Sequence, residues 1–230
     1  MYNPEKIDWQ PAQAPSRQPL QGHYVRLEPL DTTRHGDDLW QALQGPEADP
    51  MLWDYLPYGP FPEREAFNTW LAGHEASRDP LFFCVIDLAS NKAVGLLSLM
   101  SIVPKDGRIE IGHVAFGAPM QRTIGATETF WLLASLAMDT LGYRRLEWKC
   151  NANNARSMRA AERLGFRYEG TFRQHMVVKG ANRDTAWFSI IDSEWPDCRS
   201  AFSQWLRPAN FAADGAQLKR LDELRNAPSN

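Results

Sequence analysis

Residues 146–170 read LEWKCNANNARSMRAAERLGFRYEG, and this stretch decides the fold. Its first five residues complete a strand that we predict over residues 144–150. A helix is expected at residues 155–164, and Gly165 follows it as a C-cap. The next strand begins near Tyr168. A strand, a helix and a further strand in this order are typical of an α/β unit within a mixed sheet.

The preceding part of the chain predicts another strand that leads into a helix. The strand covers residues 108–116, and the helix is expected from Thr127 to Leu141, where apolar residues on nearly every side indicate burial. The loop between them exposes free backbone N–H groups, which together with the helix dipole bind phosphate oxygens. Arg122 adds a cation to such an anion site. An ordinary tight turn from strand to helix fits the same pattern.

Short turns elsewhere predict antiparallel neighbours, so the whole sheet is expected to be mixed. Further strands are expected at residues 23–30, 81–88, 93–102, 168–179 and 183–192. Further helices are expected at residues 34–43, 63–75 and 196–206. The fold class is therefore α/β with a mixed sheet.

The chain is expected to have three parts. Residues 1–21 contain Pro4, Pro11, Pro15 and Pro19, which favour an extended arm. Residues 22–193 form the predicted domain. Residues 194–230 form a C-terminal helix and a polar tail, with a short helix near residues 218–224.

Composition excludes several classes of protein. A formal net charge of -3 does not suggest a nucleic-acid-binding protein, which would need a basic face. Cys84, Cys150 and Cys198 are far apart and form no CxxC pair, which argues against a zinc site or a disulfide framework. We find neither a signal peptide nor a run near the roughly 18 apolar residues of a membrane span. We expect a cytoplasmic protein with no nucleic-acid partner, no membrane partner and no metal.

Three stretches together resemble a known family, and they cover residues 108–116, 121–128 and 154–170. The last contains an N-x-x-S pattern from Asn154, the run ERLGF and then EG. These motifs resemble the GNAT superfamily of CoA-dependent N-acyltransferases, and within it the RimJ/RimL-like ribosomal-protein acetyltransferase branch. The resemblance covers residues 22–193. It implies α/β/α layers around a mostly antiparallel twisted sheet, with acetyl-CoA as co-substrate.

The resemblance also implies where CoA binds. The pyrophosphate loop of the family reads Q/R-x-x-G-x-G/A, and here Ile124 replaces the first glycine, so its Cβ limits the approach of phosphate or keeps φ negative. A bulge in residues 113–116 is expected to aim the backbone N–H of Val114 at the thioester oxygen. Asn154 matches the position that bonds the pantetheine. The expected cofactor-binding residues are Val114, Phe116, Gln121, Arg122, Thr123, Ile124, Gly125, Ala126, Thr127, Asn154 and Ser157.

Two side chains are expected to carry the chemistry. Ser157 matches the serine that this branch places near the thioester sulfur, where it donates to the leaving thiolate, and it also suits a helix-start cap. Glu110 lies mid-strand among apolar neighbours, where burial raises the pKa of a carboxyl group, and it is the leading base. A structural acid paired with an arginine is the alternative reading of Glu110. His113 and His175 are alternative bases.

Two departures from the family pattern affect the mechanism. RimL-type enzymes have an acid at the place of Met176, and many other GNAT enzymes have a tyrosine at the place of Ala161. Both are absent here. Positioning and backbone polarisation are therefore expected to carry more of the reaction.

The acceptor is the least defined part. Loop residues 53–62 are rich in aromatics and prolines, which suits a well-packed irregular connection. The functional alternative is a wall of the substrate site, in which Trp53 and Tyr58 are expected to bind the acceptor. That acceptor is a small amine or a protein N-terminal amine. Whether the protein forms a homodimer is left open. A longer acyl donor such as succinyl-CoA is also left open, and it would need an arginine near the acyl end. The alternative function is a non-catalytic acyl-CoA sensor or interaction protein on the same fold.

Overall fold

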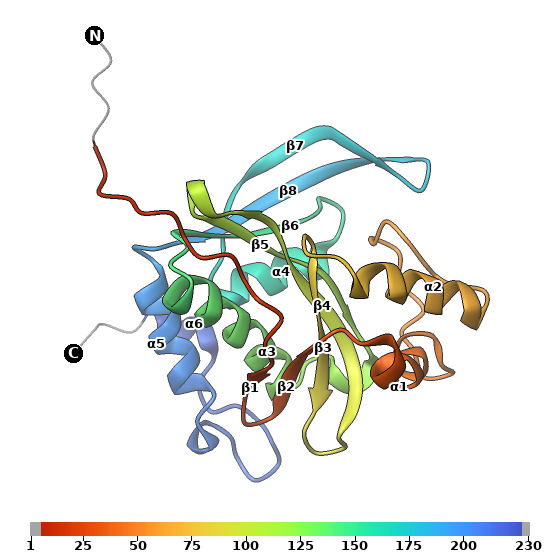
Figure 1. Ribbon diagram of the computed structural model, residues 1–230. Coiled ribbons are helices and arrows are strands. Elements are labelled where there is room, and N and C mark those ends of the chain that lie inside the picture. The colour runs from red at the N-terminus through yellow and green to blue at the C-terminus, as the bar shows by residue number, and fades with distance from the viewer. Residues whose placement is uncertain (1–5, 227–230) are drawn as a thin grey trace.

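The computed structural model describes residues 6–226 and contains one eight-stranded sheet (Figure 1). The strand order is β1-β2-β3-β4-β5-β6-β8-β7, in which β5 and β6 run parallel and the other neighbours run antiparallel. The strands are β1 Leu20–Gln21, β2 Val25–Pro29, β3 Leu81–Asp87, β4 Lys92–Val103, β5 Arg108–Phe116, β6 Arg145–Asn151, β7 Arg167–Val178 and β8 Ala181–Ile191. The predicted mixed, mostly antiparallel sheet is confirmed.

Helices cover both faces of the sheet (Figure 1). They are α1 Thr32–Gln44, α2 Arg64–Glu75, α3 Ile124–Ser135, α4 Ala155–Leu164, α5 Trp195–Trp205 and α6 Leu221–Arg225. Apolar residues of α1 and α2 share one buried cluster with the sheet, and those of α3, α4 and α5 share the other. We call these two sides the α1 face and the α3 face.

Strand β3 shows why this sheet needs helices on both sides. Its residues alternate between the two clusters, with Phe83 buried on the α3 face and Phe82 on the α1 face. Both side chains are fully buried. Burial of each such side chain contributes about 1.5–3 kcal/mol to the stability of the fold. Exposure of either face of the strand to water would therefore be unfavourable. A continuous apolar run in the sequence therefore marks the central layer of an α/β/α arrangement.

The central strands β5 and β6 separate after a short parallel contact. Their pairing covers Arg108 to Glu110 on β5 and Arg145 to Glu147 on β6, and no register continues beyond it within residues 6–226. A bulge interrupts β5 at His113, whose φ is 54°, and the register with β4 shifts there. The predicted bulge in residues 113–116 is thus confirmed.

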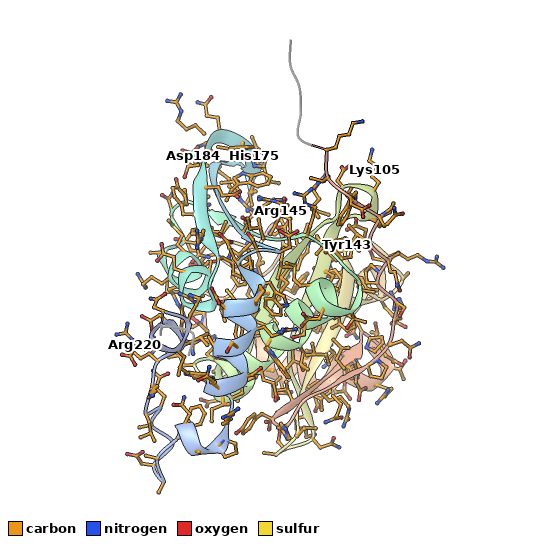
Figure 2. The ribbon with its side chains drawn as sticks, turned by 90° about the vertical axis from the view of Figure 1, so that its left-hand side faces the viewer. Lys105, Tyr143, Arg145, His175, Asp184 and Arg220 are labelled. Carbon is orange, nitrogen blue, oxygen red and sulfur yellow. The ribbon has the colours of Figure 1, made fainter. Side chains whose placement is uncertain are left out.

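The hairpin of β7 and β8 extends beyond the rest of the sheet (Figure 1). Lys179 and Gly180 form its turn, both with positive φ, which suits a two-residue hairpin connection. We had expected a three-residue connection that included Ala181. The Lys179 ammonium donates to the Trp53 carbonyl oxygen at 2.7 Å, so the tip is fixed to the loop before α2. Figure 2 shows His175 and Asp184 near the top of the molecule, on this hairpin, and Arg220 well below them.

The two ends of the chain pack on the domain. In the expected arm, Leu20 and Gln21 pair with β2, and the Trp9 indole donates to the Lys105 carbonyl oxygen at 2.9 Å. Near the other end, Leu221 is buried in the cluster of the α3 face. Residues 1–5 and 227–230, which belong to the expected arm and tail, lie outside the described residues. None of the helices in residues 6–226 is both long and apolar enough to span a membrane.

Helix α3 begins earlier than the sequence pattern predicted. Thr123 is its N-cap, and the Thr123 hydroxyl accepts a hydrogen bond from the Ala126 amide at 3.1 Å. Residues 124–126 therefore form the first helical turn rather than a loop. A threonine in the cap position outweighs the small residues that suggested a longer loop.

Candidate functional site

A cavity of about 1080 Å³ lies where β5 and β6 separate. Its lining includes Trp148 from the α3 face and Glu110 from the α1 face. Since β5 and β6 no longer pair there, the cavity passes between the strands and connects the two faces of the sheet. Both strand edges thus present backbone groups to its interior.

The start of α3 forms the end of the cavity on the α3 face. Ile124 occupies the first helical position, so its φ is helical and its Cβ needs no special conformation. The left-handed residue is instead Arg122, with a φ of 62°. Of the two expected consequences of Ile124, the negative φ is therefore confirmed, and the first residues of α3 line the end of the cavity.

Gly125 has a different role from the one we expected. It does not line the cavity, whereas Gln121, Arg122, Thr123, Ile124, Ala126 and Thr127 do. A Cβ on Gly125 would lie 2.9 Å from Cγ1 of Val25. The glycine is thus needed for close packing of α3 against β2, and any contact with a ligand would involve its backbone alone.

Helix α4 adds two of the expected residues and several cations. Asn154 is its N-cap, and its Oδ1 accepts from the Ser157 amide at 3.0 Å. The Ser157 hydroxyl accepts from the Trp148 indole at 3.0 Å, and because the indole only donates, the Ser157 proton is available to another acceptor. The cavity wall formed by α4 also contains Arg156, Arg159 and Arg163.

The β5 bulge brings His113, Val114 and Phe116 to the cavity. The Nδ1 atom of His113 lies 2.8 Å from the Tyr58 hydroxyl oxygen. Burial, with smaller contributions from His74 and Arg183, lowers the pKa of His113 to about 4. The imidazole is therefore neutral near pH 7.

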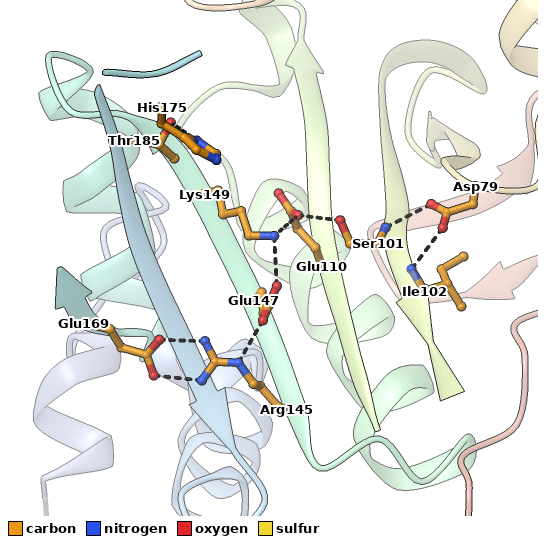
Figure 3. A network of polar contacts seen from close by, with 10 residues as sticks. All are labelled: Asp79, Ser101, Ile102, Glu110, Arg145, Glu147, Lys149, Glu169, His175 and Thr185. Carbon is orange, nitrogen blue, oxygen red and sulfur yellow. Dashed lines mark hydrogen bonds and ion pairs between the residues drawn. The ribbon is translucent and has the colours of Figure 1, made fainter. Parts of the chain in front are cut away.

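Glu110 belongs to a chain of charged groups on the α1 face (Figure 3). Its Oε2 lies 2.8 Å from the Lys149 ammonium and 3.0 Å from the Ser101 hydroxyl. Lys149 also contacts Glu147 at 2.9 Å, and Arg145 joins Glu147 to Glu169. The cation beside Glu110 is thus a lysine, where we had considered an arginine.

Two effects act on the pKa of the Glu110 carboxyl group in opposite directions. The side chain is 5% exposed, and burial raises the pKa of its carboxyl group, although the Lys149 charge opposes this.

His175, the other alternative base, also lines the cavity, but its Nδ1 lies 3.0 Å from the Thr185 hydroxyl.

The aromatic loop forms a wall of the cavity, but through residues other than those expected. Trp53 is 3% exposed and packs edge-on against Phe61 and Trp70 in the cluster of the α1 face. Tyr58 lies behind His113, to which it is hydrogen bonded. Neither aromatic side chain lines the cavity, because both complete the packing beneath the loop. The lining residues of the loop are Asp49, Met51, Leu52, Tyr55, Leu56 and Pro57.

Sequence reasoning missed several lining residues. Arg156, Arg159 and Arg163 follow a helical spacing that places them on one side of α4, so this group could have been found from the pattern. Lys149 and Arg183 could not, because only the pairing of β6 with β8 brings those strands together.

Comparisons with known proteins agree with this geometry. The acetyltransferase (GNAT) domain family matches residues 25–167. A crystal structure of a GCN5-related N-acetyltransferase from Brucella melitensis is 49% identical, with 96% of this chain and 99% of that chain covered and a TM-score of 0.93. A structure described as a probable acetyltransferase of the GNAT family, from Chromobacterium violaceum, is 43% identical, with coverage of 85% and 97% and a TM-score of 0.77.

More distant likenesses show the fold alone. The apo crystal form of RimL, a ribosomal L7/L12 alpha-N-protein acetyltransferase, is 19% identical, with coverage of 79% and 98% and a TM-score of 0.65. A comparison with curated proteins gives no match. The family match spans more than half of the chain, and the Brucella structure matches nearly all of it. This chain belongs to the GNAT acetyltransferase family.

Proposed function

We propose that this protein transfers an acetyl group from acetyl-CoA to a primary amine by direct attack on the thioester. The observation that carries the proposal is the gap between β5 and β6, which joins the start of α3 to Glu110 through one cavity. A pantetheine arm can bond to the open strand edges much as an added strand would. The thioester would then lie beside the bulge at His113 and Val114.

The α3 end suits the phosphates of CoA. Helix N-termini bind phosphate through free amides and the helix dipole. Arg122, Arg159 and Arg163 also line the cavity and add positive charge. Thr127 already accepts a hydrogen bond from Arg163 at 3.1 Å, which orients that guanidinium toward the start of α3.

The reaction needs a proton acceptor on the amine side and a proton donor on the sulfur side. The amine nitrogen attacks the carbonyl carbon, a C–N bond forms, and the C–S bond then breaks. Glu110 takes the proton that leaves the nitrogen. Burial raises the pKa of Glu110 toward neutral pH, and a general base is most effective when its pKa lies near the working pH. The Val114 amide stabilises the oxyanion, and Ser157 donates to the leaving thiolate.

The serine role predicts a specific loss of turnover. We expect Ser157→Ala to lower kcat about 10-fold, because the thiolate loses one hydrogen bond of about 1–1.5 kcal/mol, with little change in the Kd for acetyl-CoA. Ser157→Thr, which keeps the hydroxyl, should restore most of the activity. Stopped-assay kinetics of the three proteins test this, and an unchanged kcat in Ser157→Ala would remove Ser157 from the mechanism.

The function itself is tested with acetyl-CoA and a panel of amino acids, polyamines and N-terminal peptides. The expected result is thiol release that depends on the amine, with acetylated product seen by mass spectrometry. Calorimetric binding of acetyl-CoA without thiol release across the panel would contradict the proposal and favour the sensor alternative. We place the chain in the RimJ/RimL-like branch on its N-x-x-S and ERLGF motifs, so peptides with a free N-terminus belong in the panel.

A further inference from the structure

Arg183 differs from the other basic groups on the α1 face of β6 and β8. Arg145 is bonded to both Glu147 and Glu169, and Lys149 contacts Glu110 and Glu147. These cations are therefore fully matched by carboxylates. Arg183 lines the same cavity but forms no ion pair within residues 6–226.

The guanidinium of Arg183 also lacks hydrogen-bond partners. Its Nε is buried and has no acceptor among residues 6–226. The side chain as a whole is half-buried, so the cost concerns this one N–H group and is about 1–3 kcal/mol. Such a cost is repaid when a ligand supplies the missing acceptor, which makes this side chain a candidate binding group.

Strand alternation places Arg183 on the α1 face of the sheet, opposite the proposed phosphate site. Ala186 and Phe188 of β8 are buried in the cluster of the α3 face, and Thr185 and Trp187 take the other face. Arg183 has the same parity as Thr185. The proposed phosphate site at α3 and α4 belongs to the α3 face, so the phosphates of a bound CoA have their own cations there.

Arg183 lines the same cavity as Glu110, Val114 and Ser157, to which we assign roles in the reaction. Burial lowers the pKa of its guanidinium, and the negative charge of Glu110 opposes that shift. A substrate group that projects from the thioester toward the α1 face would therefore extend to the side of the cavity that Arg183 lines.

We propose that Arg183 binds a substrate carboxylate on the α1 face of the cavity, so that the enzyme prefers a carboxylate-bearing acyl donor or acceptor. This inference rests on the proposed acyl transfer and names its substrate class. Guanidinium and carboxylate form two parallel hydrogen bonds, which fits a forked donor whose Nε has no acceptor within residues 6–226. The carboxylate belongs either to the acyl group, as in succinyl-CoA, or to the acceptor, as in a free amino acid.

One set of experiments separates these two sources. Calorimetry compares acetyl-CoA with succinyl-CoA, and kinetics with acetyl-CoA compare alanine with alaninamide and other amino acids with their amides. We expect the wild type to prefer the carboxylate form about 10- to 100-fold in one of the two comparisons, and Arg183→Met to abolish that preference. Arg183→Lys should keep part of it. Arg173 is an exposed arginine on β7 of the same hairpin, so Arg173→Met is the matched control and should keep the full preference for the carboxylate form.

The outcomes also separate this inference from the proposed function. Equal use of carboxylate and neutral forms by the wild type in both comparisons would overturn the role of Arg183, even with full acetyl transfer to neutral amines. An equal loss for both forms in Arg183→Met would overturn it as well, since a structural role predicts that pattern. Absence of thiol release with every donor and amine would instead contradict the proposed acyl transfer.

Discussion

The two faces of the sheet differ in how their functional groups are assembled. On the α3 face, the groups that we assign to CoA come from two helix starts and their caps, at Thr123 and Asn154. On the α1 face, Glu110, Lys149 and Arg183 come from three different strands. The first face depends on local backbone geometry, whereas the second depends on which strands become neighbours. A donor site can therefore be recognised from short motifs, and an acceptor site cannot.

The electrostatics of the two faces differ in the same way. Arg122, at the α3 end, is exposed to water. Glu110 and His113 lie in surroundings that disfavour their charged forms, since burial raises the pKa of the first and lowers that of the second. Substitutions on the α1 face should consequently alter chemistry and pH response, and those at the α3 end should alter donor binding.

The largest expected effect is that of Glu110→Gln. We expect kcat to fall about 100- to 1000-fold, which is the lower part of the usual range for loss of a general base, while the Kd for acetyl-CoA stays within about twofold. Steady-state kinetics and calorimetry measure the two quantities. Glu169→Gln, at the other end of the same charged chain, serves as the control and should retain its activity. A fall in activity of less than about threefold would assign the base role elsewhere, with His113 next to be tested.

The second effect concerns stability in acid. His113 has a pKa of about 4 in the folded protein, against 6.5 as its ordinary value, so the unfolded chain binds this proton more readily. The contribution of His113 to stability is therefore complete above about pH 6.5 and is lost as the pH falls toward 4. We expect the wild type to lose about 2–3 kcal/mol more than His113→Gln between pH 7 and pH 4.

Urea unfolding at the two pH values measures this difference. His23→Gln removes an exposed histidine and is the control, which should lose as much stability as the wild type. If His113→Gln also lost as much as the wild type, His113 would not be held neutral by burial, and the contrast between the two faces would weaken.

A smaller effect is expected at the α3 end. Arg122→Glu replaces a cation beside the proposed phosphate site by an anion, so the Kd for CoA should rise about 10-fold and more steeply at low salt. The kcat at saturating acetyl-CoA should change little. Calorimetry at two salt concentrations tests this, with Arg199→Glu on the surface of α5 as the control. Unchanged affinity in Arg122→Glu would mean that the phosphates bind elsewhere.

Particular residues show how far the sequence could predict the site. The cap Gly165 and the bounds of α4 are as predicted, because they depend on neighbours within one helical turn. The residue that caps the start of α4 is Asn154, whereas the sequence pattern suggested Ser157 for that role. The predicted start of α3 was three residues too late, because the Thr123 cap competes with a run of small residues that also suits a loop. Trp53 was assigned to the acceptor, since an aromatic residue in a loop gives no signal of whether it packs inward or faces a ligand.

By itself, the sequence determined the family, the order of the strands and helices, and the helix starts that we assign to the donor. These features rest on hydrophobic period, capping residues and short motifs, all of which act over a few residues. The tertiary structure alone shows that β5 and β6 separate after Glu110, that Lys149 forms an ion pair with Glu110, and that the Arg183 Nε has no acceptor within residues 6–226. Those facts depend on long-range strand pairing and on the burial of charge, because the cost of an unpaired charge is set by every element that surrounds it.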